Sequence, residues 1–350
     1  NSSIWDFASS TASRNIINNM TFNNSATNFT YNGTINIKYA SGSGLTDPFG
    51  YLNISHYLNI TGTTSTSWIN LNLSYLDLDL GDVPESVLNF AKHNGTLWLT
   101  NTSLFASTYG VNTGSNVVYA NITNFSSIFA PLGNVGIINC GNLTVANSQY
   151  NLTRNLTGVQ SGRSMCIDVQ VDNVTLDCAG YGINGTTGGT TYGVYINTHN
   201  NVTIKNCNVR NYSTGISLVS ANNNAFTNNT LNSNKVQGMY FDDASNNAIT
   251  NNTAYGNTQY GMFIAYSSNN NVFTNNTANS NNQMGIYQDD CNNGTFTNNT
   301  ANSNVNYGFF ISGVGNNTLT NNTVYNNSQG FYLYQSSNGN LTNNNASFNS

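Results

Sequence analysis

The stretch GMYFDDASNNAITNNTAYGNTQYGMFIAYSSNNNVFTNNTANSNNQMGIYQDD (238–290) decides the fold, because one pattern recurs along it. A glycine opens a short apolar segment, and about ten residues later an apolar-Thr-Asn-Asn-Thr unit follows. Outward from this stretch, the same glycine recurs at steps of 22 to 24 residues: Gly193, Gly215, Gly238, Gly261, Gly285, Gly308 and Gly330. Segments this short, separated by Asn, Gly and Ser, predict strands and turns.

Each repeat predicts one turn of a coil with three short strands. Stacked turns pair their backbones at ~4.8 Å and bring equivalent side chains into rows. Alternation supplies three inward apolar rows, which are Val194, Ile216, Met239, Met262, Ile286, Phe309 and Phe331; Ile204, Phe226, Ile249, Phe273, Phe296, Leu319 and Leu341; and Val209, Leu231, Ala254, Ala278, Ala301, Val324 and Ala346. We therefore expect an all-β chain in which residues 136–350 form a right-handed parallel β-helix of about 22–24 residues per turn.

Paired asparagines mark the corner between the second and third strands of each turn. Asparagine tolerates the left-handed backbone of a tight corner, and inward amides could bond from turn to turn. An outward asparagine would instead be a glycan acceptor, since the first of each pair begins an Asn-X-Thr triplet. Both alternatives stay open for Asn228, Asn251, Asn275, Asn298 and Asn321.

The start of the coil carries a family resemblance. The segments NCGNLTVANSQYNLT (139–153), SMCIDVQVDNVTLDCAGYGING (164–185) and YGVYINTHNNVTIKNCNV (192–209) resemble the leading turns of β-helix domains in archaeal and candidate-phylum surface proteins. The resemblance covers residues 136–350 and implies the fold. It implies little about activity, because this architecture hosts lyases, hydrolases, adhesins and structural proteins.

Residues 1–135 differ from the coil. Alternating segments such as INIKYA (35–40), WINLNLSYLDLDL (68–80) and NVVYANITNF (116–125) lack the 23-residue period. This pattern predicts an Ig-like antiparallel β-sandwich that ends near Pro131–Gly136. The stretch beginning LSYLDLDLGDVPESV (73–87) resembles a β-sandwich module of archaeal surface proteins.

Composition indicates an exported chain. Charged residues make up 6% of the chain, against about 25% in an average soluble protein. There are 8 Lys and Arg and none after Lys235, which argues against a nucleic-acid partner. No apolar run reaches the ~20 residues of a membrane span. Since the chain opens on Asn1, we expect a mature or excised segment, located outside the cell or on its surface.

Roughly thirty Asn-X-Ser/Thr triplets are potential glycan acceptors in such a chain. The candidates outside the repeated corners are Asn32, Asn53, Asn94, Asn121, Asn142, Asn173, Asn211 and Asn340. We expect a glycoprotein whose attached sugars replace the missing surface charge.

The five cysteines predict disulfides, as is usual in exported proteins. Cys140 and Cys166 would staple the start of the coil, and Cys178 and Cys207 lie on what we expect to be neighbouring turns. Cys291 is then either free or available for a bond between chains.

Two aspartate pairs are the best candidates for chemistry. Asp242-Asp243 and Asp289-Asp290 occupy equivalent positions two turns apart, which corresponds to ~9.6 Å. They could be solvated turn residues, a calcium site or a pair of catalytic carboxylates. The chain lacks the Asn-Thr-Asp and Gly-His-Gly motifs of polygalacturonases and the basic residue of pectate lyases, so we expect no enzyme activity and no cofactor beyond possible calcium.

An outward row is the best candidate for binding. Two residues after the glycines come Tyr195, Tyr240, Phe263, Tyr287, Phe310 and Tyr332, with Ser217 interrupting the row. Stacked rings stabilise one another, but an aromatic patch also predicts contact with the sandwich domain, another copy, other surface proteins or glycans. Gln288 occupies the inward position that Phe241, Ile264 and Ile311 take in other turns, so it should either be hydrogen-bonded inside the coil or mark a local distortion.

Together these features predict a cell-surface structural or adhesive glycoprotein. The last repeat carries no polar cap, so we expect either that the chain was cut from something longer or that its end meets another copy. Head-to-tail contact between copies would build a filament or surface layer. The alternatives are a carbohydrate-binding module and, with less support, a polysaccharide hydrolase or lyase.

Overall fold

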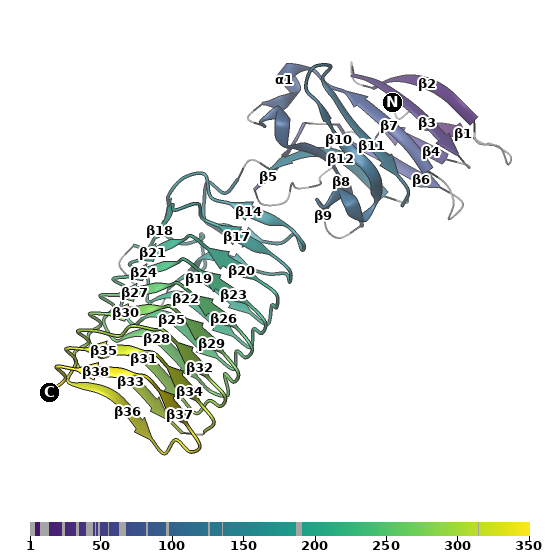
Figure 1. Cartoon of the computed structure of the whole chain (residues 1–350). Coiled ribbons are helices and arrows are strands. Elements are labelled where there is room, and N and C mark those ends of the chain that lie inside the picture. The colour runs from purple at the N-terminus through teal and green to yellow at the C-terminus, as the bar shows by residue number, and fades with distance from the viewer. Residues whose placement is uncertain are drawn as a thin grey trace. The chain divides into compact units, whose positions relative to one another are not determined.

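The computed structural model describes residues 4–7, 14–22, 25–32, 35–39, 45, 47, 50–54, 56–62, 68–81, 83–95, 98–124, 127–134, 136–186, 191–313 and 315–350. The chain divides into two compact units, Asn1–Gly136 and Ile137–Ser350. Figure 1 labels most of the strands in the two units.

The first unit contains two antiparallel sheets that share one apolar core. In spatial order, one sheet contains β1 (Ile4–Phe7), β4 (Ile35–Tyr39), β6 (Leu58–Gly62), β12 (Ser127–Asn134), β8 (Leu88–His93) and β9 (Trp98–Leu99), with β5 (Tyr51–Asn53) also pairing β12. The other contains β10 (Ala106–Asn112), β11 (Val117–Ile122), β7 (Trp68–Ser74), β3 (Ser25–Asn32) and β2 (Arg14–Phe22). Leu71 of one sheet and Phe90 and Phe129 of the other are buried in the same cluster, so alternating side chains from both sheets form the core.

One part of the predicted strand 68–80 is wrong. β7 ends at Ser74, and Asp77–Leu80 forms a short helical turn, α1. The carboxylate of Asp79 accepts a hydrogen bond from the Leu76 N–H at 2.8 Å, which caps this turn. Leu78 fits the alternating apolar pattern of the sequence, but its side chain is 92% exposed and does not contribute to the core. A single helical turn, η1 (Glu85–Val87), precedes β8, and another, η2 (Thr102–Leu104), precedes β10.

The second unit is the predicted parallel coil, and every turn adds a strand to each of two sheets and, in most turns, to a third. Sheet 1 contains β13 (Gly141–Leu143), β16 (Met165–Val169), β19 (Tyr192–Asn197), β22 (Thr214–Val219), β25 (Gln237–Asp242), β28 (Tyr260–Ala265), β31 (Met284–Asp289), β33 (Tyr307–Ser312) and β36 (Gln329–Tyr334). Sheet 2 contains β14 (Gln149–Asn151), β17 (Thr175–Asp177), β20 (Thr203–Lys205), β23 (Ala225–Thr227), β26 (Ala248–Thr250), β29 (Val272–Thr274), β32 (Thr295–Thr297), β34 (Thr318–Thr320) and β37 (Asn340–Thr342). Sheet 3 contains β15 (Leu156–Thr157), β18 (Gly182–Asn184), β21 (Asn208–Arg210), β24 (Thr230–Asn232), β27 (Thr253–Tyr255), β30 (Thr277–Asn279), β35 (Thr323–Tyr325) and β38 (Asn345–Ser347). Isolated bridges at Thr300 connect β30 to β35.

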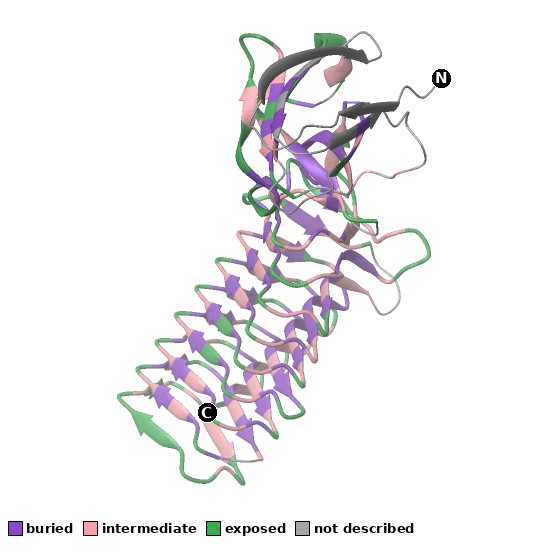
Figure 2. Ribbon diagram, turned by 90° about the vertical axis from the view of Figure 1, so that its right-hand side faces the viewer, coloured by how far each residue is buried: buried purple, intermediate pink, exposed green. Residues whose placement is uncertain are grey.

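The inward rows align as the repeat predicts. Met239 pairs with Met262 and Met262 with Ile286, each one turn further along sheet 1. These side chains are fully buried, and Figure 2 shows buried and intermediate residues alternating along the strands of the coil. Such a core forms only by stacking, because a single turn has no second layer to cover its apolar side chains.

The repeated glycine is required by close packing between turns. A Cβ built on Gly238 would lie 2.6 Å from the carbonyl oxygen of Gly261 and 3.1 Å from the Cβ of Ala254. Any larger residue would therefore push the first strand away from its neighbour. Glycine therefore recurs once per turn because the same close backbone contact recurs at each turn.

The corner asparagines form inward ladders, but these use the second residue of each pair. Asn252 donates from Nδ2 to the Asn276 Oδ1 at 3.1 Å and to the Phe226 carbonyl at 2.9 Å. Its own Oδ1 accepts from Asn229. One ladder contains Asn229, Asn252, Asn276, Asn299, Asn322 and Asn344, and a second, at the corner after sheet 3, contains Asn234, Asn257, Asn281, Asn304, Asn327 and Asn349. Buried amides are thus satisfied by the turns on either side.

Candidate functional site

The predicted aromatic row lies on the outer face of sheet 1. Phe263 of β28 and Tyr287 of β31 are register partners whose ring centroids lie 4.6 Å apart with an interplanar angle of 8°. Tyr240 lies 5.4 Å from Phe263 on the other side, and Phe310 lies 5.1 Å from Tyr287. Phe310 in turn lies 5.1 Å from Tyr332. The row from Tyr240 to Tyr332 is therefore one chain of ring contacts with half-buried side chains.

A second aromatic column, which the sequence analysis missed, widens this face. Tyr260 contacts the rings of both Phe263 and Tyr287, at 5.2 and 5.4 Å. Tyr307 contacts Phe310 and Tyr332 in the same way, at 5.0 and 5.3 Å. The sequence signal was present, because Tyr192, Tyr260 and Tyr307 each directly precede an aligned glycine. We call the two columns together the aromatic face: Tyr192, Tyr195, Tyr240, Tyr260, Phe263, Tyr287, Tyr307, Phe310 and Tyr332.

Carboxylates border the aromatic face. Asp242 ends β25 two residues after Tyr240, and Asp289 ends β31 two residues after Tyr287. Burial and the neighbouring Asp242 carboxylate, to which the hydroxyl donates, raise the pKa of Tyr240 far above its ordinary value. Burial and Asp289 raise the pKa of Tyr287 to about 12. These tyrosines stay neutral at physiological pH and hold the two carboxylates beside the rings.

The two aspartate pairs do not converge. Ala265 occupies the position between Asp242 and Asp289, so the two carboxylates lie two strand spacings apart, ~9.6 Å along the coil. Asp243 and Asp290 lie at the following corner with left-handed φ values of 51° and 52°. Within the described part of the chain, no group of three or more His, Cys, Asp or Glu side chains could hold a metal. Calcium binding by Asp242, Asp243, Asp289 and Asp290 stays a prediction.

Another carboxylate borders the aromatic face where it begins. Asp168 of β16 is the register partner of Tyr195. Its side chain forms an ion pair with Arg163 and accepts a hydrogen bond from the Gln170 amide at 2.9 Å. Burial raises the pKa of Tyr195, and Asp168 and Asp242 raise it further, so the charge of both carboxylates reaches this ring.

The structure pairs the cysteines as expected. Cys140 bonds to Cys166, and Cys178 bonds to Cys207. Cys291 is free and fully buried, so its thiol is not accessible to another chain in this fold. Gln288 is also buried, and its amide donates to the Cys291 carbonyl and to the Asn317 Oδ1, both at 2.9 Å, as predicted.

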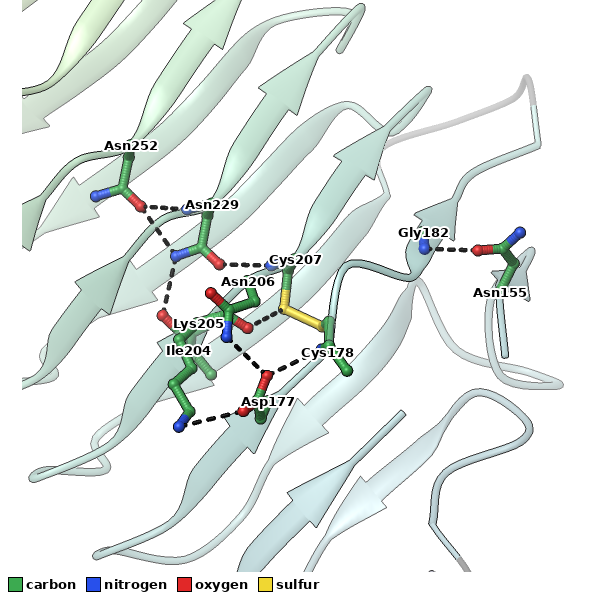
Figure 3. Close-up of a disulfide and its surroundings, with 11 residues drawn as sticks. Asn155, Asp177, Cys178, Gly182, Ile204, Lys205, Asn206, Cys207, Asn229 and Asn252 are labelled. Atoms are coloured by element: carbon green, nitrogen blue, oxygen red, sulfur yellow. Dashed lines mark hydrogen bonds and ion pairs between the residues drawn. A yellow bond between two sulfur atoms is a disulfide. The ribbon is translucent and has the colours of Figure 1, made fainter. Parts of the chain in front are cut away.

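The second disulfide lies at the start of the asparagine ladder (Figure 3). Asp177, directly before Cys178, accepts from Lys205, from the Asn206 amide and from the Ala179 N–H. Burial alone would raise the pKa of Asp177, but these donors outweigh it and lower the pKa below its ordinary value. A shallow hollow of about 550 Å³ lies nearby, lined by small polar residues that include Gly180, Asn206 and Asn228. It contains no arrangement of reactive side chains that would suggest chemistry.

The candidate glycan-acceptor asparagines differ in exposure. The first asparagine of each corner pair has a left-handed φ between 55° and 57° and an exposed side chain: Asn228, Asn251, Asn275, Asn298 and Asn321. Their neighbours form the ladder, so the ladder alternative is wrong for the first asparagine of each pair, and glycan attachment there stays a prediction. Among the other candidates, Asn94, Asn173 and Asn340 are exposed, and Asn53, Asn121, Asn142 and Asn211 are half-buried. The side chain of Asn32 lies outside what the structure describes.

Two family descriptions match parts of the chain. Residues 192–348 match the right handed beta helix region, and residues 88–257 match the periplasmic copper-binding protein family NosD. No curated protein matches. With the coil described above, these matches show that the chain carries parallel β-helix repeats. No helix among the described residues has the length and apolar character to cross a bilayer.

Solved β-helix structures share the fold at low identity. The periplasmic alginate epimerase AlgG is 17% identical over 56% of this chain and 50% of its own, with a TM-score of 0.38. An alginate lyase from Paenibacillus sp. is 16% identical over 59% of this chain and 97% of its own, with a TM-score of 0.39. The Dettilon tailspike protein is 12% identical over 59% of this chain and 55% of its own, with a TM-score of 0.47. The chain thus spans about half the length of the epimerase.

The prediction that this chain is not an enzyme is corrected by these matches. It depended on missing motifs of two enzyme families, yet the solved β-helix structures that this chain resembles include an alginate epimerase, a mannuronan C-5 epimerase, an alginate lyase and a pectate lyase. The physical reason is that a coil presents long outer faces on which different residue sets can act, so missing motifs do not exclude catalysis. At 12% to 18% identity the matches show the fold alone.

Copper, which the NosD description names, does not fit the histidines and cysteines in the part of the chain that the structure describes. Copper in proteins is bound mainly by clustered His, Cys and Met side chains. His56 pairs with Asp79 in the first unit, and His199 pairs with Asp172 on the coil. Four of the five cysteines form disulfides, and the fifth is buried. Among the described residues, no group of three or more His, Cys, Asp or Glu side chains could hold a metal, so the histidines and cysteines there form no copper site.

Proposed function

We propose that this chain, a parallel β-helix repeat protein, is an exported cell-surface adhesin that binds polysaccharide along the aromatic face. The observation that carries the proposal is the continuous, solvent-facing contact between rings on five consecutive strands, β25 to β36. If these rings served only to stabilise the fold, they would bury more apolar area by facing the core. Instead they face outward. A large outward aromatic patch is typical of a contact surface.

The aromatic face suits an extended polymer better than a compact ligand. Equivalent rings repeat at ~4.8 Å along a straight row, so successive sugars of a chain can meet similar surroundings. Aromatic rings offer apolar area for the C–H faces of sugars, and the tyrosine hydroxyls offer hydrogen bonds at the edges. Each contact is weak, but a polymer gains affinity from many contacts at once.

Binding to glycan arrays and to polysaccharides in affinity gels tests the proposal. Wild-type protein should bind at least one polysaccharide with micromolar affinity, and Phe263→Ala with Tyr287→Ala should weaken binding at least about tenfold. The matched control is Tyr255→Ala, which removes an outward ring of sheet 3 that is 42% exposed. Absence of binding by the wild type, or equal loss in the control, would contradict the proposal.

The same assays should follow the bound polymer over time. Released oligosaccharides or unsaturated products would show that binding leads to catalysis. Loss of these products in Asp242→Asn or Asp289→Asn, with binding retained, would assign the reaction to the border of the aromatic face.

Assembly of copies head to tail into a filament or surface layer remains a prediction. Electron microscopy of material sheared from cells would reveal ordered filaments or sheets if it is correct. Dispersed single particles would contradict it and leave the polysaccharide proposal in place.

A further inference from the structure

The residues around the aromatic face allow its ligand class to be narrowed, on the assumption that the proposed polysaccharide binding holds. The carboxylates Asp168, Asp242 and Asp289 all lie on the same outer side of sheet 1 as the rings. Only Asp168 has a cationic partner in the described residues, namely Arg163. Asp242 and Asp289 lie in the part of the chain after Lys235, which contains no Lys or Arg.

The two unpaired carboxylates are oriented by neutral donors. Tyr240 donates to Asp242, and Ser312 of the next strand donates to Asp289, which Tyr287 also contacts. Each carboxylate keeps further acceptor capacity, since an ionised carboxylate has about four lone-pair positions. These groups can therefore accept hydrogen bonds from a ligand lying on the rings, while repelling any negative charge on it.

A polymer of acidic sugars is the wrong ligand for such a surface. Each sugar of such a polymer would bring a carboxylate to a surface that already carries Asp242 and Asp289. Like charges at short range repel one another. No Lys or Arg in the second half of the aromatic face could compensate. The alginate and pectate enzymes among the similar structures are named for acidic polymers. A similar fold therefore does not imply the same ligand class for this chain.

We infer that the aromatic face binds polysaccharides without acidic groups, whose hydroxyl or ammonium groups donate to Asp242 and Asp289 while the sugar rings stack on Tyr240, Phe263 and Tyr287. Amino sugars, which add a positive charge, should bind more tightly than neutral sugars of the same length.

Titration calorimetry with three hexasaccharides tests this inference: glucosamine oligomers, neutral N-acetylglucosamine or glucose oligomers, and uronate oligomers. At mildly acidic pH and low salt, affinity should fall in that order. The double variant Asp242→Asn/Asp289→Asn should reduce the preference for glucosamine oligomers over neutral oligomers about tenfold. It should also raise the affinity for uronate oligomers towards the affinity for neutral oligomers. Asp172→Asn, which changes a carboxylate outside sheet 1, should leave the order unchanged.

Each outcome separates the two proposals. Binding of uronates more tightly than neutral oligomers would overturn the ligand class but keep polysaccharide binding. Uronate binding that appears only with calcium and disappears with EDTA would also overturn it, and would instead support the predicted calcium site at Asp242 and Asp289. Failure of every oligomer and polymer to bind would overturn both.

Discussion

Phe263 and Tyr287 occupy neighbouring strands of sheet 1 with their rings nearly parallel, 4.6 Å between centroids. They are direct register partners, so the coil itself sets their separation. Stacking at this distance stabilises the coil whether or not a ligand binds. Any functional role of the aromatic face must therefore be separated from its contribution to stability.

A double-mutant cycle measures that contribution. Phe263→Ala and Tyr287→Ala should each lower the free energy of unfolding, and the double variant should lose less than the sum by about 1 kcal/mol, the coupling of an aromatic pair. Urea unfolding followed by fluorescence provides the measurement. Additive losses would show that the rings do not stabilise each other, and a polysaccharide present at a fixed concentration should raise the wild-type midpoint more than that of the double variant.

The asparagine ladder should be sensitive to a change of a single atom. Asn276 is 1% exposed and donates to the Ile249 carbonyl at 2.8 Å and to the Asn299 Oδ1 at 3.0 Å. Asn276→Asp removes both donors and buries a carboxylate against oxygens, so it should destabilise the coil by about 3 kcal/mol or more. The control is Asn275→Asp, the same substitution at the exposed neighbour, which should cost less than about 0.5 kcal/mol. Equal losses in thermal unfolding would contradict the ladder.

Cys291 should be chemically silent in the folded protein. Burial raises the pKa of its thiol to about 12, so the reactive thiolate is scarce and unreachable. Ellman's reagent should label no thiol in the native protein and one per chain in denaturant without reductant. Labelling of native protein, or of more than one thiol in denaturant, would contradict the burial or the disulfide pairs.

Removing the second disulfide should destabilise the start of the coil. Cys178 and Cys207 close a loop with a sequence separation of 29 residues, and such a bond contributes about 2–4 kcal/mol. Cys178→Ala/Cys207→Ala should lower the unfolding midpoint accordingly, whereas Cys291→Ala, as a control, should cost only the small volume lost from the core. A midpoint unchanged by the double variant would show that stacking alone holds these turns.

Acid should weaken the coil through Asp177. Its folded-state pKa lies below its ordinary value, so protonation favours the unfolded chain. The stabilisation is complete above the unfolded-state pKa of ~3.9 and is lost as the pH falls through the folded-state pKa. Urea midpoints measured from about pH 6 to about pH 2 should fall less steeply for Asp177→Asn than for the wild type. Parallel curves would contradict the assignment.

The fold of the coil could be predicted because its information is local and repeated. A glycine period, alternating apolar residues and short Asn-rich turns each recur once per turn, so errors at one turn are corrected by the next. The pairing of Cys140 with Cys166 and of Cys178 with Cys207 follows from the same register. The outward direction of Phe263 and Tyr287 also follows, since alternation around a glycine determines which face a side chain occupies.

Other features depend on geometry that no local pattern contains. Which asparagine of each pair turns inward depends on the corner, where Asn275 takes a left-handed backbone and aims Asn276 at the next turn. The contact of Tyr260 with Tyr287 arises because strands 24 residues apart in sequence become neighbours. The helical turn at Asp77–Leu80 forms because the Asp79 carboxylate caps it where the sheet ends. The sequence by itself therefore determined the repeat and the direction of its side chains, and only the tertiary structure decided which of them meet, because those distances are set by the stacking of turns.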